Sequence, residues 1–319
     1  MVSVNRLTRR IVDDLVENAE FYRVEVEELP CGTKVVDTGL EAPGGFLAGI
    51  KLTEICLGGL AEVSLSYVSY SPEFSLPSIV VSTDFPAISL LGCQLAGWMV
   101  KVGDFFAPSS GPARALARKP KKVFEKIEYR DEADVATLVM ETTKKPTDEV
   151  AKKVAETCGV DPKNLYLVLT STNSMAGSVQ VSGRVVETGL YRLEFLGLDP
   201  TKVVYATGYA PIMPPHPDPG VSTAREEDAL IYGGYAIYVV DEEEETLREL
   251  AERAPATCWP DYGKLSYEAL KAVDFDWSKL DPSFFTIGRI ELVCKKTGKA
   301  FGAGKVNPEM LKRSLEFSP

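Results

Sequence analysis

A run of apolar, β-forming residues, Leu165 to Leu169, is followed at once by a polar loop and then by a helix-forming stretch. The loop and the helix together occupy residues 171–190. The same alternation recurs elsewhere, with β-like runs at 78–82, 135–140 and 203–206 and helical stretches at 86–100 and 146–158. Short strands that alternate with helices predict an α/β fold, or a mixed α+β fold.

Three of the expected helices carry additional signals. Apolar residues recur every three or four positions in two of them, at Leu7, Ile11, Leu15 and Ala19 and at Ile88, Leu91, Leu95 and Trp98. Ser3 is placed to cap the first of these helices. The third begins with acidic residues, buries Val150, Val154 and Cys158, and ends at Gly159, which is typical of a helix C-terminus.

A chain of 319 residues is long enough for two domains. Two pairs of segments resemble each other: 38–43 with 207–211, and 57–61 with 232–236. We interpret them as a weak internal repeat with both copies in one domain, formed by residues 1–75 and 200–319, while 76–199 form a second domain. Chance similarity is the alternative, because the matches consist mainly of glycine, alanine and proline.

The charge and hydropathy of the chain exclude several classes of protein. A net charge of −11 argues against nucleic acid or an anionic membrane as the main partner. Runs of about 20 apolar residues are absent, and charges interrupt the N-terminal segment. We therefore expect neither a membrane span nor a signal peptide. A cytoplasmic location is the corresponding prediction.

Cysteine and histidine usage limits the available chemistry. The two closest of the six cysteines lie 25 residues apart, so we expect buried free thiols rather than a metal or redox pair. The single histidine, His216, lies among prolines and excludes a histidine-rich metal site. A rigid loop is the expected setting for His216, with a substrate contact as the alternative. Dinucleotide, zinc and calcium motifs are also missing, which favours an enzyme without metal or nucleotide.

Two segments could form a functional site. Arg184 and Glu187 lie three residues apart on the expected helix, so a carboxylate and a guanidinium share one face; the alternative is an ordinary surface ion pair. Ser110 to Arg114 combine a capping serine, a proline suited to a first helical turn and an arginine, which together can bind an anion. The alternative for this second segment is a capped surface helix.

Two C-terminal features are structural in character. Residues 241–245 are all acidic, and we expect a solvated helix start there, before Leu247 and Leu250. Residues 290–294 and 300–301 flank a Lys-Thr-Gly turn and predict a β-hairpin.

Four ordered segments together resemble one family. They are GCQLAGW at 92–98, SSGPARALA at 109–117, STNSMAGSVQVSGRVVETG at 171–189 and GYAPIMPP at 208–215. In this order, and with the LTRRIVDDLVENAE opening, the chain resembles the methenyltetrahydromethanopterin cyclohydrolases of archaeal one-carbon metabolism and methanogenesis. The resemblance implies two α/β domains with a pocket between them, a homotrimer, no metal and no prosthetic group. It also implies reversible hydrolysis of the methenyl bridge to a 5-formyl group.

The resemblance assigns roles to individual residues. The family's catalytic pair maps onto Glu187 as the base and Arg184 as its partner. We expect the substrate's phosphate at Ser110, Gly111, Pro112, Ala113 and Arg114, and further substrate contacts at Thr83, Asp84 and Gln180. Leu95 stands where some relatives have lysine, so that lysine is dispensable or replaced. Alternatives are another metal-free pterin enzyme of one-carbon chemistry or a non-catalytic pterin-binding protein.

Overall fold

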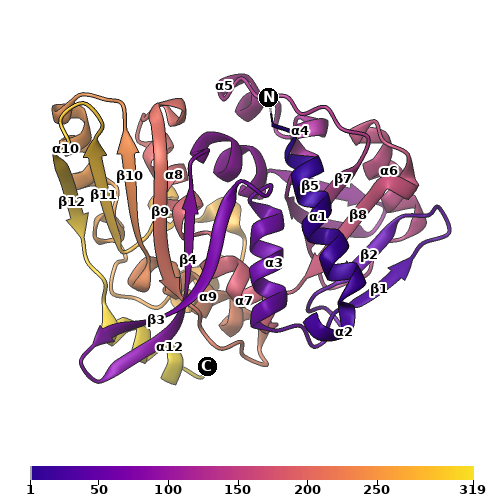
Figure 1. Cartoon of the computed structure of the whole chain (residues 1–319). Helices are drawn as coiled ribbons and strands as arrows, with labels where there is room; N and C mark the ends of the chain where they lie inside the picture. Colours follow the sequence, from indigo (N-terminus) through magenta and orange to yellow (C-terminus); the bar gives the residue numbers. More distant parts are fainter. Residues whose placement is uncertain (1) are drawn as a thin grey trace. The chain divides into compact units, whose positions relative to one another are not determined.

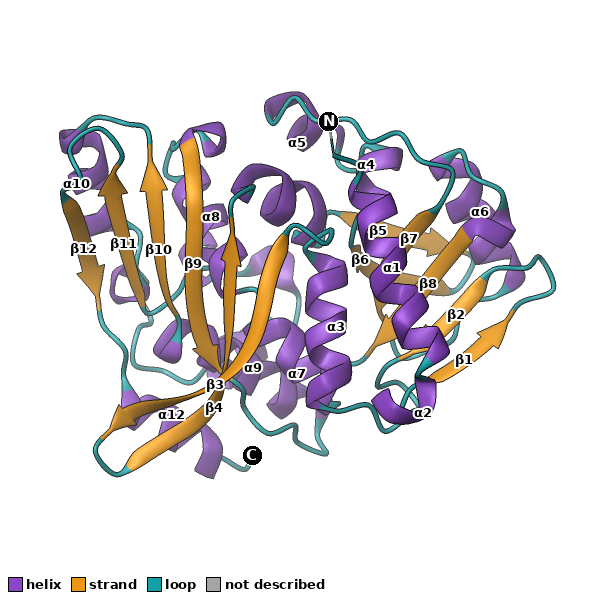
Figure 2. Cartoon of the chain, viewed as in Figure 1, coloured by secondary structure: helices purple, strands orange, loops and turns teal. Residues whose placement is uncertain are grey.

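The computed structural model describes residues 2–319, which form two compact units, each built on its own six-stranded sheet (Figures 1 and 2). The first unit contains the described residues up to Glu62 together with Ala87–Gln180. The second contains Val63–Pro86 and Val181–Pro319. Both sheets mix parallel and antiparallel neighbours, so the predicted mixed α/β class is confirmed.

The sheet of the first unit has the strand order β1-β2-β8-β7-β6-β5. Its strands are β1 (Glu25–Glu28), β2 (Lys34–Asp37), β5 (Trp98–Val102), β6 (Phe105–Ser110), β7 (Ala136–Glu141) and β8 (Leu165–Thr170). The three strands β2, β8 and β7 run parallel, whereas the outer pairs are antiparallel. The strands predicted at 135–140 and 165–169 are thus confirmed at the centre of this sheet.

Helices cover both faces of this first sheet. They are α1 (Val4–Glu17), α2 (Ala19–Tyr22), α3 (Phe46–Cys56), the π-helical segment η1 (Ala87–Gln94), α4 (Ala113–Ala117), α5 (Lys121–Lys126), α6 (Asp148–Cys158), the 3-10 turn η2 (Pro162–Asn164) and α7 (Met175–Ser182). Helix α6 shares one apolar cluster with the sheet, and α1 and α3 share the other. Every residue of β8 is buried, which explains its unbroken apolar run.

Helix caps follow the sequence signals, and the buried face of α1 follows them in part. The Ser3 hydroxyl accepts the Arg6 N–H at 3.3 Å, and Gly159 ends α6 in the left-handed region at φ 72°. The predicted amphipathic helix is confirmed as α1, whose fully buried residues are Val4, Asn5, Thr8, Val12 and Leu15. Of the predicted stripe, Leu7 and Ile11 are half-buried, and Ile11 packs against the apolar core. The inward face is set by polar bonds, because the Asn5 amide donates to the Asp131 carboxylate at 2.7 Å.

The helix predicted over residues 86–100 is wrong beyond Gln94. Residues 98–102 form β5 and pair with β6 in antiparallel register. Trp98 and Val100 are buried while Met99 and Lys101 are exposed, which is the two-residue period of a strand. The pairing partner β6 is a tertiary feature that helical periodicity in this segment does not reveal.

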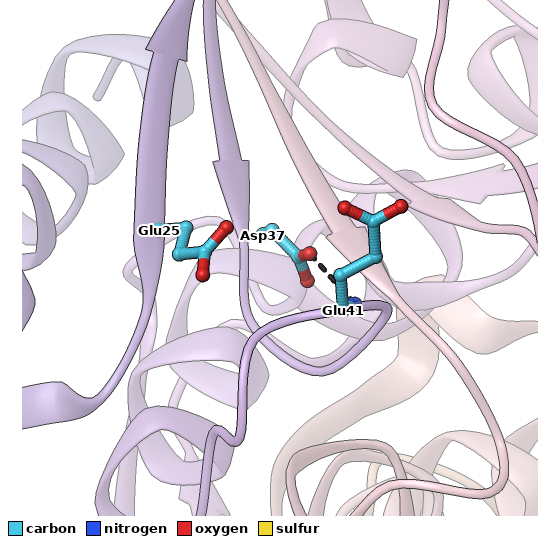
Figure 3. Close-up of side chains that lie close together, drawn as sticks. All are labelled: Glu25, Asp37 and Glu41. Atoms are coloured by element: carbon cyan, nitrogen blue, oxygen red, sulfur yellow. Dashed lines mark hydrogen bonds between the residues drawn. The ribbon is translucent and has the colours of Figure 1, made fainter.

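The loop after β2 is organised by one carboxylate, that of Asp37. Its two oxygens accept backbone N–H groups from Gly39, Leu40, Glu41 and Ala42, at 2.6 to 3.1 Å. Figure 3 shows the Asp37 carboxylate turned toward the Glu41 backbone, with Glu25 of β1 nearby. The charge of this buried aspartate therefore fixes the course of the chain from β2 toward α3.

The sheet of the second unit has the order β12-β11-β10-β9-β4-β3. Its strands are β3 (Ala61–Ser71), β4 (Phe74–Thr83), β9 (Val203–Pro211), β10 (Tyr235–Val240), β11 (Arg289–Cys294) and β12 (Ala300–Gly304). Strands β10 and β11 are parallel, and β11 and β12 form the predicted hairpin. The strands predicted at 78–82 and 203–206 are confirmed within β4 and β9, both of which are longer than expected.

Helices of the second unit pack mainly on one face of its sheet. They are α8 (Val185–Phe195), α9 (Pro219–Gly233), α10 (Glu244–Arg253), α11 (Ser266–Ala272) and α12 (Pro308–Glu316), with 3-10 turns η3 (Pro200–Lys202), η4 (Ala256–Cys258), η5 (Trp277–Lys279) and η6 (Pro282–Phe284). Along β10 and β11 every second residue is buried, and the residues between them are partly exposed. This alternation is typical of a sheet with helices on one side.

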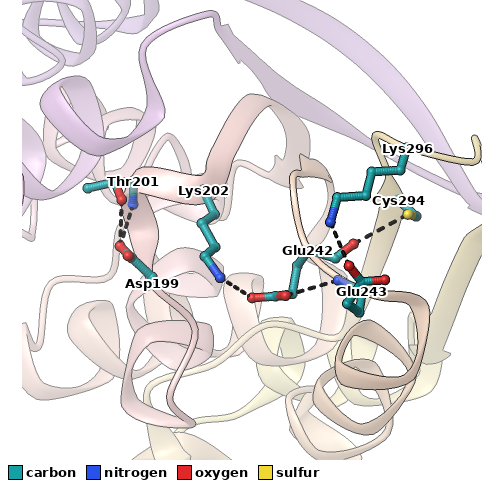
Figure 4. Close-up of polar contacts among 7 residues, drawn as sticks. All are labelled: Asp199, Thr201, Lys202, Glu242, Glu243, Cys294 and Lys296. Atoms are coloured by element: carbon teal, nitrogen blue, oxygen red, sulfur yellow. Dashed lines mark hydrogen bonds and ion pairs between the residues drawn. The ribbon is translucent and has the colours of Figure 1, made fainter.

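The acidic run at 241–245 begins α10 as predicted, with Leu247 and Leu250 buried. Its carboxylates are also paired with lysines. Figure 4 shows Lys202 with Glu242 and Lys296 with Glu243. The two lysines are well exposed to solvent, so each pair contributes little to stability.

The division into units differs from the expected one. Strand β2 pairs with β8, which joins the N-terminal segment to residues 87–180 rather than to 200–319. In the interpreted repeat, 38–43 belong to the first unit, and 57–61 lead from α3 into β3 of the second sheet. Both segments of the first copy lie within the first unit and both segments of the second copy lie within the second, so the two copies do not share one compact unit.

All six cysteines are free thiols, and four are buried as expected, while Cys31 is half-buried and Cys258 is exposed. Burial raises the pKa of Cys93 and of Cys158 to about 12, which makes both thiols inert at neutral pH. Among residues 2–319 no helix has the length and apolar character needed to cross a membrane.

Asp228 of α9 predicts a pH-dependent stability. Its buried carboxylate accepts bonds from Ser266 and Ser314, yet burial raises its pKa to about 6 from 3.8. The folded state therefore binds this proton more tightly than the unfolded state does. Protonation of Asp228 contributes its full stabilisation of the fold below about pH 4, and this contribution is lost as pH rises through about 6. Urea unfolding of the wild type and Asp228→Asn should show a stability difference that shifts by up to about 3 kcal/mol in favour of the wild type at low pH. A difference that is constant with pH would contradict a raised pKa.

Candidate active site

The polar loop after β8 is a helix-capping turn. The Ser174 hydroxyl accepts the Gly177 N–H at 3.0 Å and so begins α7. A Cβ atom at Gly177 would overlap the carbonyl oxygen of Ser171. Close packing of the chain on itself therefore explains this glycine.

The helix predicted through 171–190 is two helices with a break before Arg184. The Arg184 N–H bonds to the Val181 carbonyl at 2.9 Å, and the Thr188 N–H bonds to the Arg184 carbonyl at 2.8 Å. The Ser182 hydroxyl donates to the Pro211 carbonyl at 2.8 Å and ties this break to the end of β9. Arg184 thus occupies the N-cap position of α8, and Glu187 lies in its first turn.

Arg184 and Glu187 form a pair that is nearly buried. Arg184 Nη1 lies 3.5 Å from Glu187 Oε2, and the two side chains are only 14% and 7% exposed. An ordinary surface ion pair is excluded by this burial, because both charged groups have lost most of their contact with water. The helix dipole stabilises the glutamate at the start of α8 but disfavours the arginine there, so the position of Arg184 is not a product of helix stability.

The charge of Glu187 influences two tyrosines that the sequence did not predict as site residues. Burial is the main cause that raises the pKa of Tyr191 and of Tyr238, and the charge of Glu187 raises both further. Tyr191 lies one turn after Glu187 on α8, whereas Tyr238 comes from β10. In the sequence Tyr238 is one residue of an apolar strand, and no pattern there distinguishes it from its neighbours.

The segment Ser110 to Arg114 is buried throughout and is not a surface turn. Ser110 ends β6 instead of capping, and α4 begins after Pro112 with no side-chain cap. The Arg114 guanidinium donates to the carbonyls of Leu91, Cys93 and Lys119 at 2.9 to 3.2 Å and lies over the Phe124 ring. Nε and Nη1 of Arg114 are thus engaged by the main chain, which favours a structural role for this side chain over the expected phosphate contact.

The weaker substrate candidates differ in how their polar groups are engaged. Thr83 is buried at the end of β4, and its hydroxyl accepts the Phe85 N–H at 3.1 Å, while Asp84 is exposed. Gln180 on α7 is 1% exposed, and its Oε1 has no hydrogen-bond partner among the described residues. Of these three, Gln180 has the side chain best suited to recognise a polar ligand atom.

His216 and Leu95 have local structural settings. The His216 Nδ1 accepts the Asp218 N–H at 3.0 Å, and Asp218 in turn caps α9. This matches the expected rigid loop. Leu95 follows η1 and is half-buried, so an apolar side chain is accommodated at this position.

One group of carboxylates in the described chain has the spacing to hold a metal ion: Glu25, Asp37 and Glu41, with oxygens within 4.8 Å of one another (Figure 3). Both Asp37 oxygens already accept backbone N–H groups, and Lys145 approaches Glu41 at 3.1 Å. A cation would have to compete with these donors. The cluster is explained by its role in shaping the loop.

A buried carboxylate held by an arginine at the start of a helix is typical of an enzyme site that moves protons. Comparison with known proteins agrees. Residues 3–315 match the family model described as Cyclohydrolase (MCH). The chain is 45% identical over 318 residues to methenyltetrahydromethanopterin cyclohydrolase of Methanothermobacter marburgensis, covering 99% of each chain. The enzymes of the same name from Methanocaldococcus jannaschii and Methanospirillum hungatei are 45% and 41% identical, again over at least 99% of each chain. The chain belongs to this family of cyclohydrolase enzymes, which confirms the resemblance.

Arg114 gives a prediction that separates a structural role from phosphate binding. Arg114→Ala leaves three carbonyl acceptors without their donor and should cost about 3 kcal/mol or more in unfolding free energy. Lys122→Ala, which removes an exposed basic side chain eight residues further along the chain, should stay within about 0.5 kcal/mol. Chemical denaturation of both variants measures this. An Arg114→Ala variant as stable as the Lys122 control would restore a ligand role for Arg114.

Proposed function

We propose that this chain catalyses the reversible hydrolysis of 5,10-methenyltetrahydromethanopterin to 5-formyltetrahydromethanopterin. The relatives that match it along its full length carry this activity in their names. The observation that carries the proposal is the nearly buried Arg184–Glu187 pair at the start of α8. It supplies one base and one cation, which is what addition of water to a cationic carbon requires.

Glu187 is the proposed base. The methenyl bridge carbon is an amidinium-like cation, and water must attack it, lose a proton and leave a formyl group after one C–N bond breaks. A carboxylate can pair with the cationic substrate and accept the proton of the attacking water. Because the substrate itself supplies the electrophile, positioning and one base are sufficient.

Arg184 is the proposed partner of the base. Its charge favours the ionised carboxylate of Glu187. The guanidinium has five N–H donors, so it can contact Glu187 and also bond the oxygen that develops on the bridge carbon. The proposed reaction requires no metal, prosthetic group or nucleotide.

Substrate contacts are proposed for the remaining predicted residues. The main chain of Ser110, Gly111, Pro112 and Ala113 is the proposed phosphate site, with Arg114 holding that turn in place rather than touching the ligand. Gly111 has a φ of 98°, a backbone conformation that suits glycine and allows close approach of a ligand. Gln180 is proposed to read a polar edge of the pterin, and Thr83 and Asp84 are weaker candidates.

A homotrimer is also proposed, as the resemblance implies. Large apolar side chains remain exposed on β3 and β9 of the second unit, at Leu65, Tyr67 and Tyr205. Self-association would remove such surface from water.

The proposed activity is tested by the absorbance of methenyltetrahydromethanopterin with purified protein and no added metal or nucleotide. We expect rapid loss of the methenyl chromophore. Glu187→Gln should lower the rate by about 100- to 10,000-fold, because it removes the base without changing the shape of the side chain. Glu194→Gln, which removes the same charge from the same helix, should stay close to the wild type.

Two results would contradict this assignment. Binding of the substrate without turnover in a folded wild type would favour the non-catalytic pterin-binding protein. A loss below about tenfold in Glu187→Gln would remove Glu187 from the role of base, while leaving the reaction itself in place.

The negative charge predicts that self-association depends on salt. A net charge of −11 on each chain repels its neighbours over about 30 Å at about 10 mM salt and over only about 3 Å at about 1 M. Sedimentation velocity should therefore show smaller species at low salt and trimers at high salt. A trimer that is stable without added salt, or a monomer at every salt concentration, would contradict this prediction.

A further inference from the structure

The hydroxyl of Tyr238 lies inside the second unit against the first turn of α8. Tyr238 belongs to β10 and is fully buried. Its hydroxyl donates to the carbonyl of Val186 at 2.8 Å. Val186 immediately precedes Glu187, and Leu190 follows Glu187 by three residues.

Val186 and Leu190 are the i and i+4 partners of one helical hydrogen bond. The tyrosine oxygen therefore contacts the helical turn from Val186 to Leu190, and this turn contains Glu187. Gly189 makes this possible, because a Cβ atom there would overlap the Tyr238 hydroxyl. Glycine inside a helix is unfavourable by about 1 kcal/mol relative to alanine. The space that Gly189 leaves for the hydroxyl therefore lowers the intrinsic stability of the helix.

Simple packing does not explain this contact. Phenylalanine would fill the same interior volume without a polar atom, and α8 could then carry alanine in place of Gly189. A tyrosine with the same burial, Tyr232 of α9, lies in the same unit and bonds its hydroxyl to the Lys264 carbonyl and the Gly263 N–H. The two tyrosines differ in what they hold, since only Tyr238 contacts the turn that carries Glu187.

We propose that Tyr238 is a positioning residue for the reaction: its hydroxyl fixes the first turn of α8 and thereby the place of the Glu187 carboxylate. The inference rests on the proposed role of Glu187 as the base. Without the hydroxyl, the Val186 carbonyl loses its contact with β10, the first turn of α8 is held less firmly, and the carboxylate can move. A displacement of about 1 Å in a catalytic group can lower a rate by about 100-fold.

The protonation of Tyr238 suits this role. Burial, together with the charge of Glu187, holds the pKa of this hydroxyl well above 10. It therefore remains a donor to Val186 over the whole pH range in which Glu187 is ionised, and its hold on the turn does not change as the base takes up and releases a proton.

The test compares Tyr238→Phe with Tyr232→Phe. Both variants lose one buried hydroxyl, so their losses of stability should be similar. Tyr238→Phe should lower kcat by about 10- to 100-fold with KM within about threefold, whereas Tyr232→Phe should keep kcat within about threefold of the wild type. Equal kcat values in the two variants would overturn the proposal.

A double-mutant cycle with Glu187→Gln separates positioning from general disturbance. If Tyr238 acts through the carboxylate, Tyr238→Phe should change the residual rate of Glu187→Gln by no more than about twofold. A full additional loss in that background would show that Tyr238 acts by another route and would overturn the proposal. If Glu187→Gln alone is fully active, the proposed base fails and the positioning role fails with it. If Glu187→Gln is inactive and Tyr238→Phe is normal, only the positioning role fails.

Gly189 provides a second variant in case Tyr238→Phe does not fold. Gly189→Ala places a methyl group where the hydroxyl lies and should push the oxygen away from Val186. It should lower kcat and leave KM nearly unchanged, with the same lack of additivity toward Glu187→Gln. A Gly189→Ala variant that is folded and fully active would overturn the proposal independently.

Discussion

Burial of the Arg184 and Glu187 charges at the start of α8 is the constraint on which the neighbouring structure depends. Two charged groups that leave water must be held in fixed geometry, because a mobile pair would regain less than it loses in hydration. The chain meets this requirement with contacts from β9 and β10: Ser182 bonds to the end of β9, and Tyr238 reaches the first turn of α8 from β10. The sheet of the second unit thus positions a helix start, and the helix start positions the carboxylate.

Other buried charges in the chain have a different purpose. Arg114 bonds to three carbonyl oxygens, and Arg225 bonds to carbonyls near the end of α12, including that of Leu315 at 2.8 Å. The Asp37 carboxylate instead accepts hydrogen bonds from four backbone N–H groups. Each of these side chains is a local replacement for missing backbone partners, and it stabilises a turn. Arg184 differs because its guanidinium contacts another ionisable group, Glu187, which is the arrangement that the proposed proton transfer requires.

Local features of the fold were predictable from the sequence because they depend on near neighbours. The β8 run, the caps at Ser3 and Gly159 and the hairpin at β11 and β12 are decided within about ten residues. Features decided by distant partners were not. Residues 98–102 became a strand because β6 is available to pair with them, and the N-terminal segment joined the first unit through β2 and β8. Glu187 was identified from its spacing to Arg184, whereas Tyr238 needed the fold, since its contact with Val186 spans 52 residues.

The length of the Arg184–Glu187 contact also has a chemical consequence. A bidentate arginine at about 2.8 Å would hold the carboxylate so firmly in its ionised form that it would be a poor proton acceptor. A carboxylate buried alone would tend to be protonated, and it could not accept the proton of water at all. The 3.5 Å separation between Arg184 Nη1 and Glu187 Oε2 lies between these limits. In the proposed mechanism this separation keeps the charge on Glu187 favourable while leaving the carboxylate basic, so the proposed base depends on a separation that α8, and not the pair itself, must maintain.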